Sequence, residues 1–148
     1  MHERLNAEDP GETMPFDATM MRRTLAEITL NPIRGTAAVL APEGRLGGYA
    51  LLISFWSNEF GGEICAIDEL YVEPEFRGRG FAMQFIASLA NPGNPFWPRP
   101  IAAIAVEAYR TNPRAKILYE KLGFKASPNH SLILPLAVSH RGPATKIR

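Results

Sequence analysis

Apolar residues recur along most of the chain at one of two spacings, interrupted by short breaks rich in glycine and proline. Spacings of three and four, typical of a helix with one buried face, occur over residues 17–30, 81–90 and 112–122. Compact apolar runs typical of strands occur over residues 36–40, 48–56, 64–72, 101–108, 124–127 and 130–136. Strands come first and strand–helix–strand units follow, so the pattern predicts a mixed α/β fold.

The breaks also predict how the chain is organised. Residues 1–15 are polar and broken by prolines and a glycine, so we expect them to be loose, as a flexible N-terminal segment, or to wrap the surface. A single domain is expected over residues 16–136, followed by a flexible basic tail at 137–148. Within the domain, the proline-rich residues 91–100 must be irregular.

A glycine-rich turn separates the strand predicted at residues 64–72 from the helix predicted after it. Gly78 and Gly80 leave backbone N–H groups uncovered by side chains, so that a bulky anion can approach them. A helix N-terminus carries a partial positive charge and unpaired donors. Arg77 and Arg79 add full charges beside it. This junction is therefore predicted to hold a phosphate or pyrophosphate.

Two common phosphate-binding motifs do not fit this turn. No Gly-Lys-Ser/Thr run of a P-loop is present, and Met83 stands where the dinucleotide-binding motif needs its third glycine. What remains is Arg-x-x-Gly-x-Ala, filled by Arg77, Gly80 and Ala82. With the apolar strand end, proline and aromatic residue before it, this motif resembles the acyl-CoA pyrophosphate loop of the GNAT N-acetyltransferases.

A second segment strengthens the resemblance. Residues 112–124 match the family's second signature, Asn-x-x-Ala-x-x-Leu-Tyr-x-Lys-x-Gly-Phe. Taken alone, the segment indicates a capped amphipathic helix, with Asn112 as its N-cap and Gly123 as its stop. Because the two signatures occur in the family's order with a strand between them, GNAT membership is favoured. The resemblance covers residues 36–136.

The resemblance implies a fold, a reaction and a cofactor site. The fold would be the α/β (α+β) GNAT fold, with a mixed central sheet of about six strands, splayed at the acyl-CoA site and flanked by helices. The reaction would be transfer of the acetyl group of acetyl-CoA, by direct attack, to a primary amine of a small molecule or peptide. The implied cofactor-binding residues are Leu70, Tyr71, Val72, Arg77, Gly78, Arg79, Gly80, Phe81, Ala82, Asn112 and Ala115.

Direct transfer needs a group that removes a proton from the amine and a group that assists the departing thiolate. Tyr119 stands where family members often have the tyrosine that assists the thiolate, although it could simply pack on a helix face. Three strand carboxylates are candidate bases, in the order Glu69, Glu107 and Asp68. Adjacent strand residues face opposite sides, so Asp68 and Glu69 share one site only if the strand bulges. A carboxylate that only binds substrate, or only pairs with an arginine, is nearly as well supported.

The acceptor pocket is the least defined part of the predicted site. Besides Asp68, we expect Trp56, Asn58 and Phe60 to bind the substrate, because aromatic residues in a loop can hold a cationic amine. A half-buried hairpin or a dimer contact accounts for them equally well. The amine itself is open, as is the choice between monomer and homodimer.

Composition fits a small enzyme. The 148 residues carry a formal net charge of +1, which indicates neither a nucleic-acid partner nor a membrane surface. The N-terminus lacks a signal-peptide core, so a cytoplasmic location is expected. Cys65 is the single cysteine and is expected to be an inert buried thiol, and the three histidines show no metal-ligand spacing, so no metal is expected.

Two other function classes are open to test. A non-catalytic acyl-CoA sensor would share the phosphate-binding turn but could dispense with Tyr119 and the strand carboxylates. A nucleic-acid binder would use residues 77–80, Arg-Gly-Arg-Gly, as a basic motif, which the near-neutral charge of the chain opposes.

Overall fold

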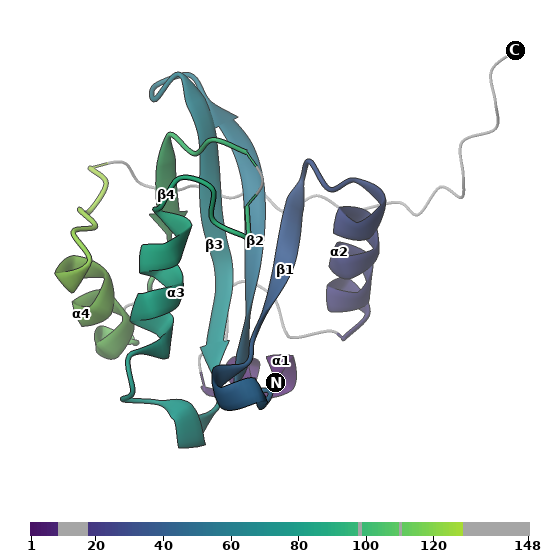
Figure 1. The fold of residues 1–148 in the computed structure, drawn as a ribbon, viewed down its shortest axis with the longest axis vertical. Helices are drawn as coiled ribbons and strands as arrows, with labels where there is room; N and C mark the ends of the chain where they lie inside the picture. The colour runs from purple at the N-terminus through teal and green to yellow at the C-terminus, as the bar shows by residue number, and fades with distance from the viewer. Residues whose placement is uncertain (9–17, 98, 110, 129–148) are drawn as a thin grey trace, which may run out of the picture.

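The computed structural model describes residues 1–8, 18–97, 99–109 and 111–128 and contains a mixed sheet flanked by helices (Figure 1). The described strands are β1 (Gly35–Leu40), β2 (Gly48–Ser57), β3 (Gly62–Val72) and β4 (Ala103–Val106). The described α-helices are α1 (His2–Glu8), α2 (Ala18–Leu30), α3 (Phe81–Leu89) and α4 (Pro113–Lys121). Two 3₁₀ turns are η1 (Pro42–Gly44) and η2 (Pro74–Phe76).

The four described strands lie in the order β1-β2-β3-β4. β1, β2 and β3 are antiparallel neighbours, as short connections between consecutive strands allow. β4 joins β3 in parallel, and α3 provides the crossover between them. Their pairing is short, running only from Ile64↔Ala103 to Ile67↔Val106. β3 therefore continues beyond its partner.

The main core lies between the sheet and α3. Phe85, Ile86 and Leu89 are the buried residues of α3, and they form one cluster with Cys65 and Ile67 of β3. The helix presents these residues at spacings of one, three and four, so one stripe faces the sheet. α4 packs beside α3 through partly buried apolar side chains (Figure 1). α2 contacts β1 on the other side of the molecule, with Ile28 buried.

β3 contains a bulge at Asp68. Leu51 pairs with Glu69 and Leu52 pairs with Ile67, so Asp68 is an extra residue on β3. The bulge changes which face the later residues occupy. Ile67 and Leu70, three positions apart, both pack in the cluster with α3, and Glu69 is placed on the opposite face.

An ion pair ties the proline-rich residues after α3 to the sheet. Arg99 donates two hydrogen bonds of 2.8 Å from Nε, and one of 2.6 Å from Nη2, to the Glu63 carboxylate. Its Nη2 also donates to the carbonyl of Ile33, at 2.9 Å. Ser54 donates a further hydrogen bond to Glu63, at 2.6 Å. Arg99 thus joins the irregular connection to β3 and to the turn before β1.

Most predicted elements are confirmed within a few residues, and one differs. Residues 124–127 were expected to be a strand but are not: Phe124 donates its N–H to the carbonyl of Tyr119 and packs its ring on Tyr119, so it caps α4 instead. Residues 2–8 form α1, within the segment expected to be loose or to wrap the surface. The strand expected at 130–136 lies outside the described residues.

The described residues contain no helix long and apolar enough to cross a membrane. They also contain no group of three or more His, Cys, Asp or Glu side chains that could hold a metal ion.

Candidate functional site

The lower half of β3 has one edge that no described strand covers. Pairing with β4 ends at Ile67, whereas β3 runs on to Val72. The N–H of Glu73 donates to the carbonyl of Gly47 at 2.8 Å, so the backbone groups of residue 73 point toward β2. Because backbone groups alternate along a strand, those of Leu70 and Val72 point the other way, toward β4. We call residues 68–72 on this side the open β3 edge.

The open β3 edge leads directly into the glycine turn, residues 77–82, which we call the phosphate loop. Gly78 and Gly80 have φ values of 74° and 82°, a region that glycine adopts without strain. Gly80 is the N-cap of α3, and no side chain caps the helix there. The first N–H groups of α3 are therefore presented by Gly80, Phe81 and Ala82 at a positive helix end.

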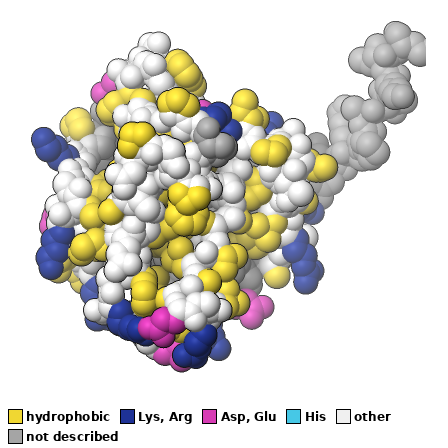
Figure 2. All heavy atoms as spheres, in the orientation of Figure 1, with side chains coloured by type: hydrophobic (Ala, Val, Ile, Leu, Met, Phe, Trp, Pro, Cys, Tyr) yellow, Lys and Arg dark blue, Asp and Glu magenta, His cyan; other side chains and the backbone are white. Residues whose placement is uncertain are grey.

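The two arginines of the phosphate loop are paired with carboxylates. Arg77 donates from Nε to the carbonyl of Val72 at 2.7 Å and forms an ion pair with Glu8 at 2.7 Å. Arg79 forms an ion pair with Glu43 of η1. Figure 2 shows acidic and basic side chains side by side at this lower end of the molecule. Both expected positive charges are present, but part of each is offset by a neighbouring glutamate.

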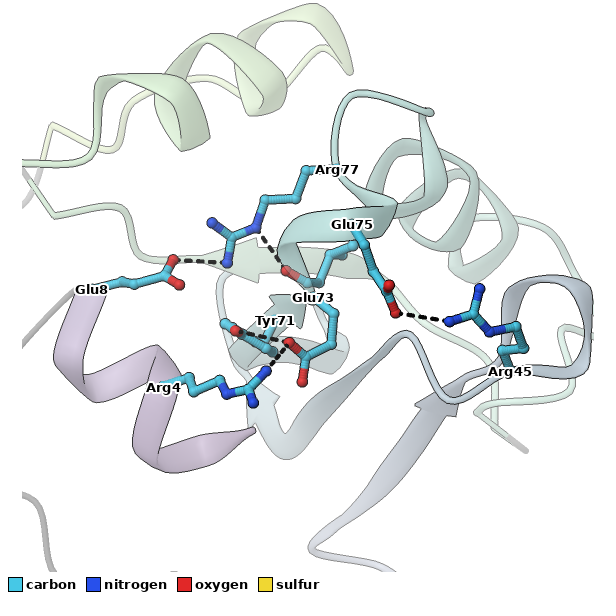
Figure 3. A network of polar contacts seen from close by, with 8 residues as sticks. Arg4, Glu8, Arg45, Tyr71, Glu73, Glu75 and Arg77 are labelled. Carbon is cyan, nitrogen blue, oxygen red and sulfur yellow. Dashed lines mark hydrogen bonds and ion pairs between the residues drawn. The ribbon is translucent and has the colours of Figure 1, made fainter.

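α1 contacts the strand end that carries the phosphate loop (Figure 3). Arg4 donates from Nη1 to the Glu73 carboxylate at 2.7 Å, and the Tyr71 hydroxyl donates to the same carboxylate at 3.3 Å. Glu8, one helical turn later, contacts Arg77 as described above. α1 therefore contacts both Glu73, just after β3, and Arg77, the first residue of the phosphate loop.

The three carboxylates expected to include the base lie near one another. Asp68 and Glu69 are brought to the same region by the bulge, and Glu107 follows the last residue of β4. Desolvation, followed by the negative charges of Glu69 and Glu107, raises the pKa of Asp68 above its ordinary value, although its side chain retains contact with solvent. We call these residues the carboxylate cluster.

Glu69 also has a partner that the sequence did not indicate. The Tyr49 hydroxyl donates a 2.6 Å hydrogen bond to the Glu69 carboxylate. Tyr49 pairs with Tyr71 in the sheet. Glu69 lies two residues before Tyr71 on the same face of β3, so it is the diagonal neighbour of Tyr49. The bulge at Asp68 sets this pairing of β2 with β3. Because the sequence did not establish the bulge, it could not link Tyr49 to Glu69.

Tyr119 lies on the other side of the sheet from Glu69. It packs against the cluster that contains the buried residues of α3, and its ring centroid lies 5.6 Å from that of Phe124. At the start of the same helix, the Asn112 side chain accepts a 3.1 Å hydrogen bond from the N–H of Ala115. The predicted N-cap is thus confirmed.

The expected acceptor residues of the β2–β3 hairpin are not brought to the carboxylate cluster. Trp56 and Phe60 are exposed at the end of β3 where that strand begins, as is Asn58, and the phosphate loop lies at the other end. Trp56 pairs with Glu63, six residues before Glu69 on β3, so at roughly 3.3 Å per residue about 20 Å separates it from the carboxylate cluster. Asp68 is the one member of the four expected substrate-binding residues that belongs to the open β3 edge.

Residues 34–126 match the family described as Acetyltransferase (GNAT) domain. A comparison with curated protein sequences finds no match.

Solved structures with the same fold include three acetyltransferases. A possible acetyltransferase from Clostridium difficile 630 is 18% identical with a TM-score of 0.67, covering 90% of this chain and 86% of its own. A predicted acetyltransferase from Clostridium acetobutylicum, solved with acetyl-CoA, is 20% identical with a TM-score of 0.65, covering 95% and 88%. An aminoglycoside acetyltransferase from an uncultured soil metagenomic sample is 12% identical with a TM-score of 0.63, covering 91% and 84%.

Proposed function

The chain belongs to the GNAT acetyltransferase family, and on that premise we propose that it transfers the acetyl group of acetyl-CoA to a primary amine of a small molecule or peptide. The observation that carries the proposal is the continuity of the open β3 edge with the phosphate loop. An extended chain that ends in a pyrophosphate matches this arrangement, since the edge offers strand-like hydrogen bonds and the loop offers an anion site.

The residues present fit acetyl-CoA. Leu70 and Val72 present backbone groups to an added strand-like partner, which is the shape of the pantetheine arm. The glycine backbone at Gly78 and Gly80 keeps side chains away from the pyrophosphate position. Arg77 and Arg79 belong to the phosphate loop and would add positive charge there once their glutamate partners are displaced or shared.

The catalytic residues are assigned by their position around the open β3 edge. Bound acetyl-CoA supplies a thioester carbon open to direct attack by the amine. A member of the carboxylate cluster, with Glu69 preferred over Glu107 and Asp68, removes a proton from the incoming ammonium. The Val72 N–H is the expected donor to the thioester carbonyl oxygen. Tyr119, on the α3 side, donates a proton or hydrogen bond to the departing thiolate, so base and acid act from opposite faces of the sheet.

The acceptor is proposed to be cationic when it binds. A carboxylate cluster attracts an ammonium ion, and protonated amines dominate at neutral pH. One solved structure of the same fold is an aminoglycoside acetyltransferase, but at 12% identity the similarity supports only a shared fold and not a shared substrate. Small-molecule and peptide amines are both within this proposal.

Replacing Gly80 with valine tests cofactor binding. We expect Gly80→Val to weaken acetyl-CoA binding at least about tenfold by calorimetry, because a β-branched residue is strained at a φ of 82° and adds a side chain to the loop proposed to bind the pyrophosphate. Gly93→Val is the matched control, since Gly93 has a φ of 74° in the loop after α3. Equal affinity in a folded Gly80→Val protein would falsify the loop assignment.

A panel of amines separates an enzyme from a non-catalytic sensor. We expect acetyl-CoA and the right amine together to release free CoA thiol, measured with a thiol reagent. Cys65 will not contribute to the signal, because the side chain is fully buried and desolvation raises its pKa to about 12. Tight acetyl-CoA binding without CoA release for any amine in the panel would favour the sensor.

A further inference from the structure

We propose that Tyr49 is a positioning residue that holds the Glu69 carboxylate in place for the amine reaction. The inference rests on the proposed function, because it assigns Tyr49 a part in that reaction. Its basis is the 2.6 Å hydrogen bond that the Tyr49 hydroxyl donates to Glu69 across two paired strands.

Tyr49 stands on a rigid part of the sheet. Gly48, the residue before it, packs so closely that a Cβ there would lie 2.3 Å from the carbonyl oxygen of Tyr71. The Gly47 carbonyl accepts the N–H of Glu73 at 2.8 Å, which joins the start of β2 to the end of β3. The Tyr49 ring lies 6.2 Å from that of the buried Tyr71. These contacts leave the hydroxyl little freedom to leave Glu69.

Tyr49 is also a permanent donor. Burial, followed by its hydrogen bond to Glu69, raises the pKa of Tyr49 well above its ordinary value. The hydroxyl therefore keeps its proton throughout the pH range in which an amine is acetylated. A donor that cannot ionise always offers the carboxylate the same hydrogen bond.

The surroundings explain why Glu69 needs this partner. Asp68 on β3 and Glu107 after β4 are the acidic groups that interact with one another around it, and Tyr71 lies on the same face as Tyr49. Repulsion from the other two carboxylates favours rotamers that carry Glu69 away from them. The Tyr49 hydrogen bond opposes this movement and stabilises the anionic form of the carboxylate.

Kinetics of Tyr49→Phe test the inference, because phenylalanine keeps the ring and removes only the donor. We expect kcat for the amine reaction to fall about tenfold, the loss of one hydrogen bond to a charged group, with the KM for acetyl-CoA unchanged. In a Glu69→Gln background, Tyr49→Phe should have no further effect. Independent, multiplicative effects of the two substitutions overturn the inference.

A spectroscopic measurement that needs no turnover completes the test. In protein labelled with ¹³C at its glutamate carboxyls, with Glu69→Gln assigning the signal, Tyr49→Phe should shift the Glu69 carboxyl resonance, because the carboxylate loses a hydrogen bond. Tyr71→Phe is the matched control and should leave that resonance unmoved, because the Tyr71 hydroxyl bonds Glu73. An unmoved resonance in Tyr49→Phe overturns the inference while the proposed function stands. A wild-type protein that releases no CoA with any amine overturns the proposed function instead, and Tyr49 loses its positioning role with it.

Discussion

Two neighbouring carboxylates in β3 differ in what surrounds them. Glu69 is held by the Tyr49 hydroxyl, whereas Asp68 occupies the bulge with access to solvent. Desolvation, followed by the negative charges of Glu69 and Glu107, raises the pKa of Asp68 above its ordinary value, so its anionic form is disfavoured. At the scale of single residues, the Tyr49 hydrogen bond is the feature that favours Glu69 over Asp68 in the proposed role of base.

The first residue-scale prediction concerns the base. Glu69→Gln should slow the amine reaction about a hundredfold at neutral pH and much less at alkaline pH, where the amine is already deprotonated. The measurement is kcat/KM for the amine between pH 7 and pH 10. Glu107→Gln is the matched comparison, since it removes another charge from the same carboxylate cluster.

The pattern of the two defects ranks the candidates. A Glu69→Gln defect of constant size across this pH range would assign Glu69 to substrate binding. Full activity in both variants would show that a water chain, or no enzyme base, accepts the proton.

A second residue-scale prediction concerns Tyr119. Tyr119→Phe keeps the ring that packs against the core cluster and Phe124, so the fold and acetyl-CoA affinity should change little. Turnover should fall about tenfold or more, because the lost hydroxyl is the group proposed to assist the departing thiolate. Rapid-mixing measurement of CoA release checks the expected loss of turnover, and calorimetry of acetyl-CoA binding checks the unchanged affinity. Equal turnover would leave Tyr119 with a packing role.

At the scale of elements, β3, the phosphate loop and α3 work as one unit. The strand supplies an open edge, the glycine backbone turns without a side chain in the way, and the helix supplies its N-terminal amides. Arg77 connects the parts, since it bonds the carbonyl of Val72 and contacts α1 through Glu8. The unit is positioned by packing of α3 on the sheet rather than by the loop itself.

The element-scale prediction concerns the connection after α3. Arg99→Met should lower the free energy of unfolding by about 2 kcal/mol at pH 7, less than a fully buried pair would lose because solvent reaches both side chains. Arg99 hydrogen bonds hold the pKa of Glu63 below its ordinary value of 4.5, so the pair stabilises the fold above that pH. This contribution is lost as the pH falls through the lowered pKa.

Denaturant unfolding at pH 7 and at about pH 3 measures the effect. The loss in Arg99→Met should shrink at the lower pH, because the contribution of the pair declines once the pH falls below the ordinary pKa of Glu63. Arg22→Met, at an exposed position of α2, is the control and should change stability by less than about 0.5 kcal/mol at either pH. An equal loss in Arg99→Met at both pH values would show that packing, not the ion pair, accounts for it.

At the scale of the whole molecule, the sheet separates the residues proposed for two chemical tasks. The α3 face carries the core cluster and Tyr119, and the opposite face carries Tyr49 and Glu69. The open β3 edge lies between them, so a thioester bound there as proposed would be accessible from both sides. The exposed aromatic residues of the β2–β3 hairpin lie at the other end of β3.

The sequence by itself determined the features that depend on near neighbours in the chain. The phosphate loop follows from glycines at 78 and 80, and the start of α4 follows from Asn112, which bonds Ala115 three residues later. These features are encoded within a few residues, because turn conformations and caps need only local contacts. The strand pattern also predicted the sheet, since alternation and turn residues are local signals.

Only the tertiary structure decided how the strands align. One extra residue at the Asp68 bulge changes the face of every later β3 residue, and this is what brings Glu69 to Tyr49. The same alignment pairs Trp56 with Glu63, near the start of β3 and away from the carboxylate cluster. Such choices depend on which packing of the two strands buries the most apolar surface, and that energy is shared by residues far apart in the chain.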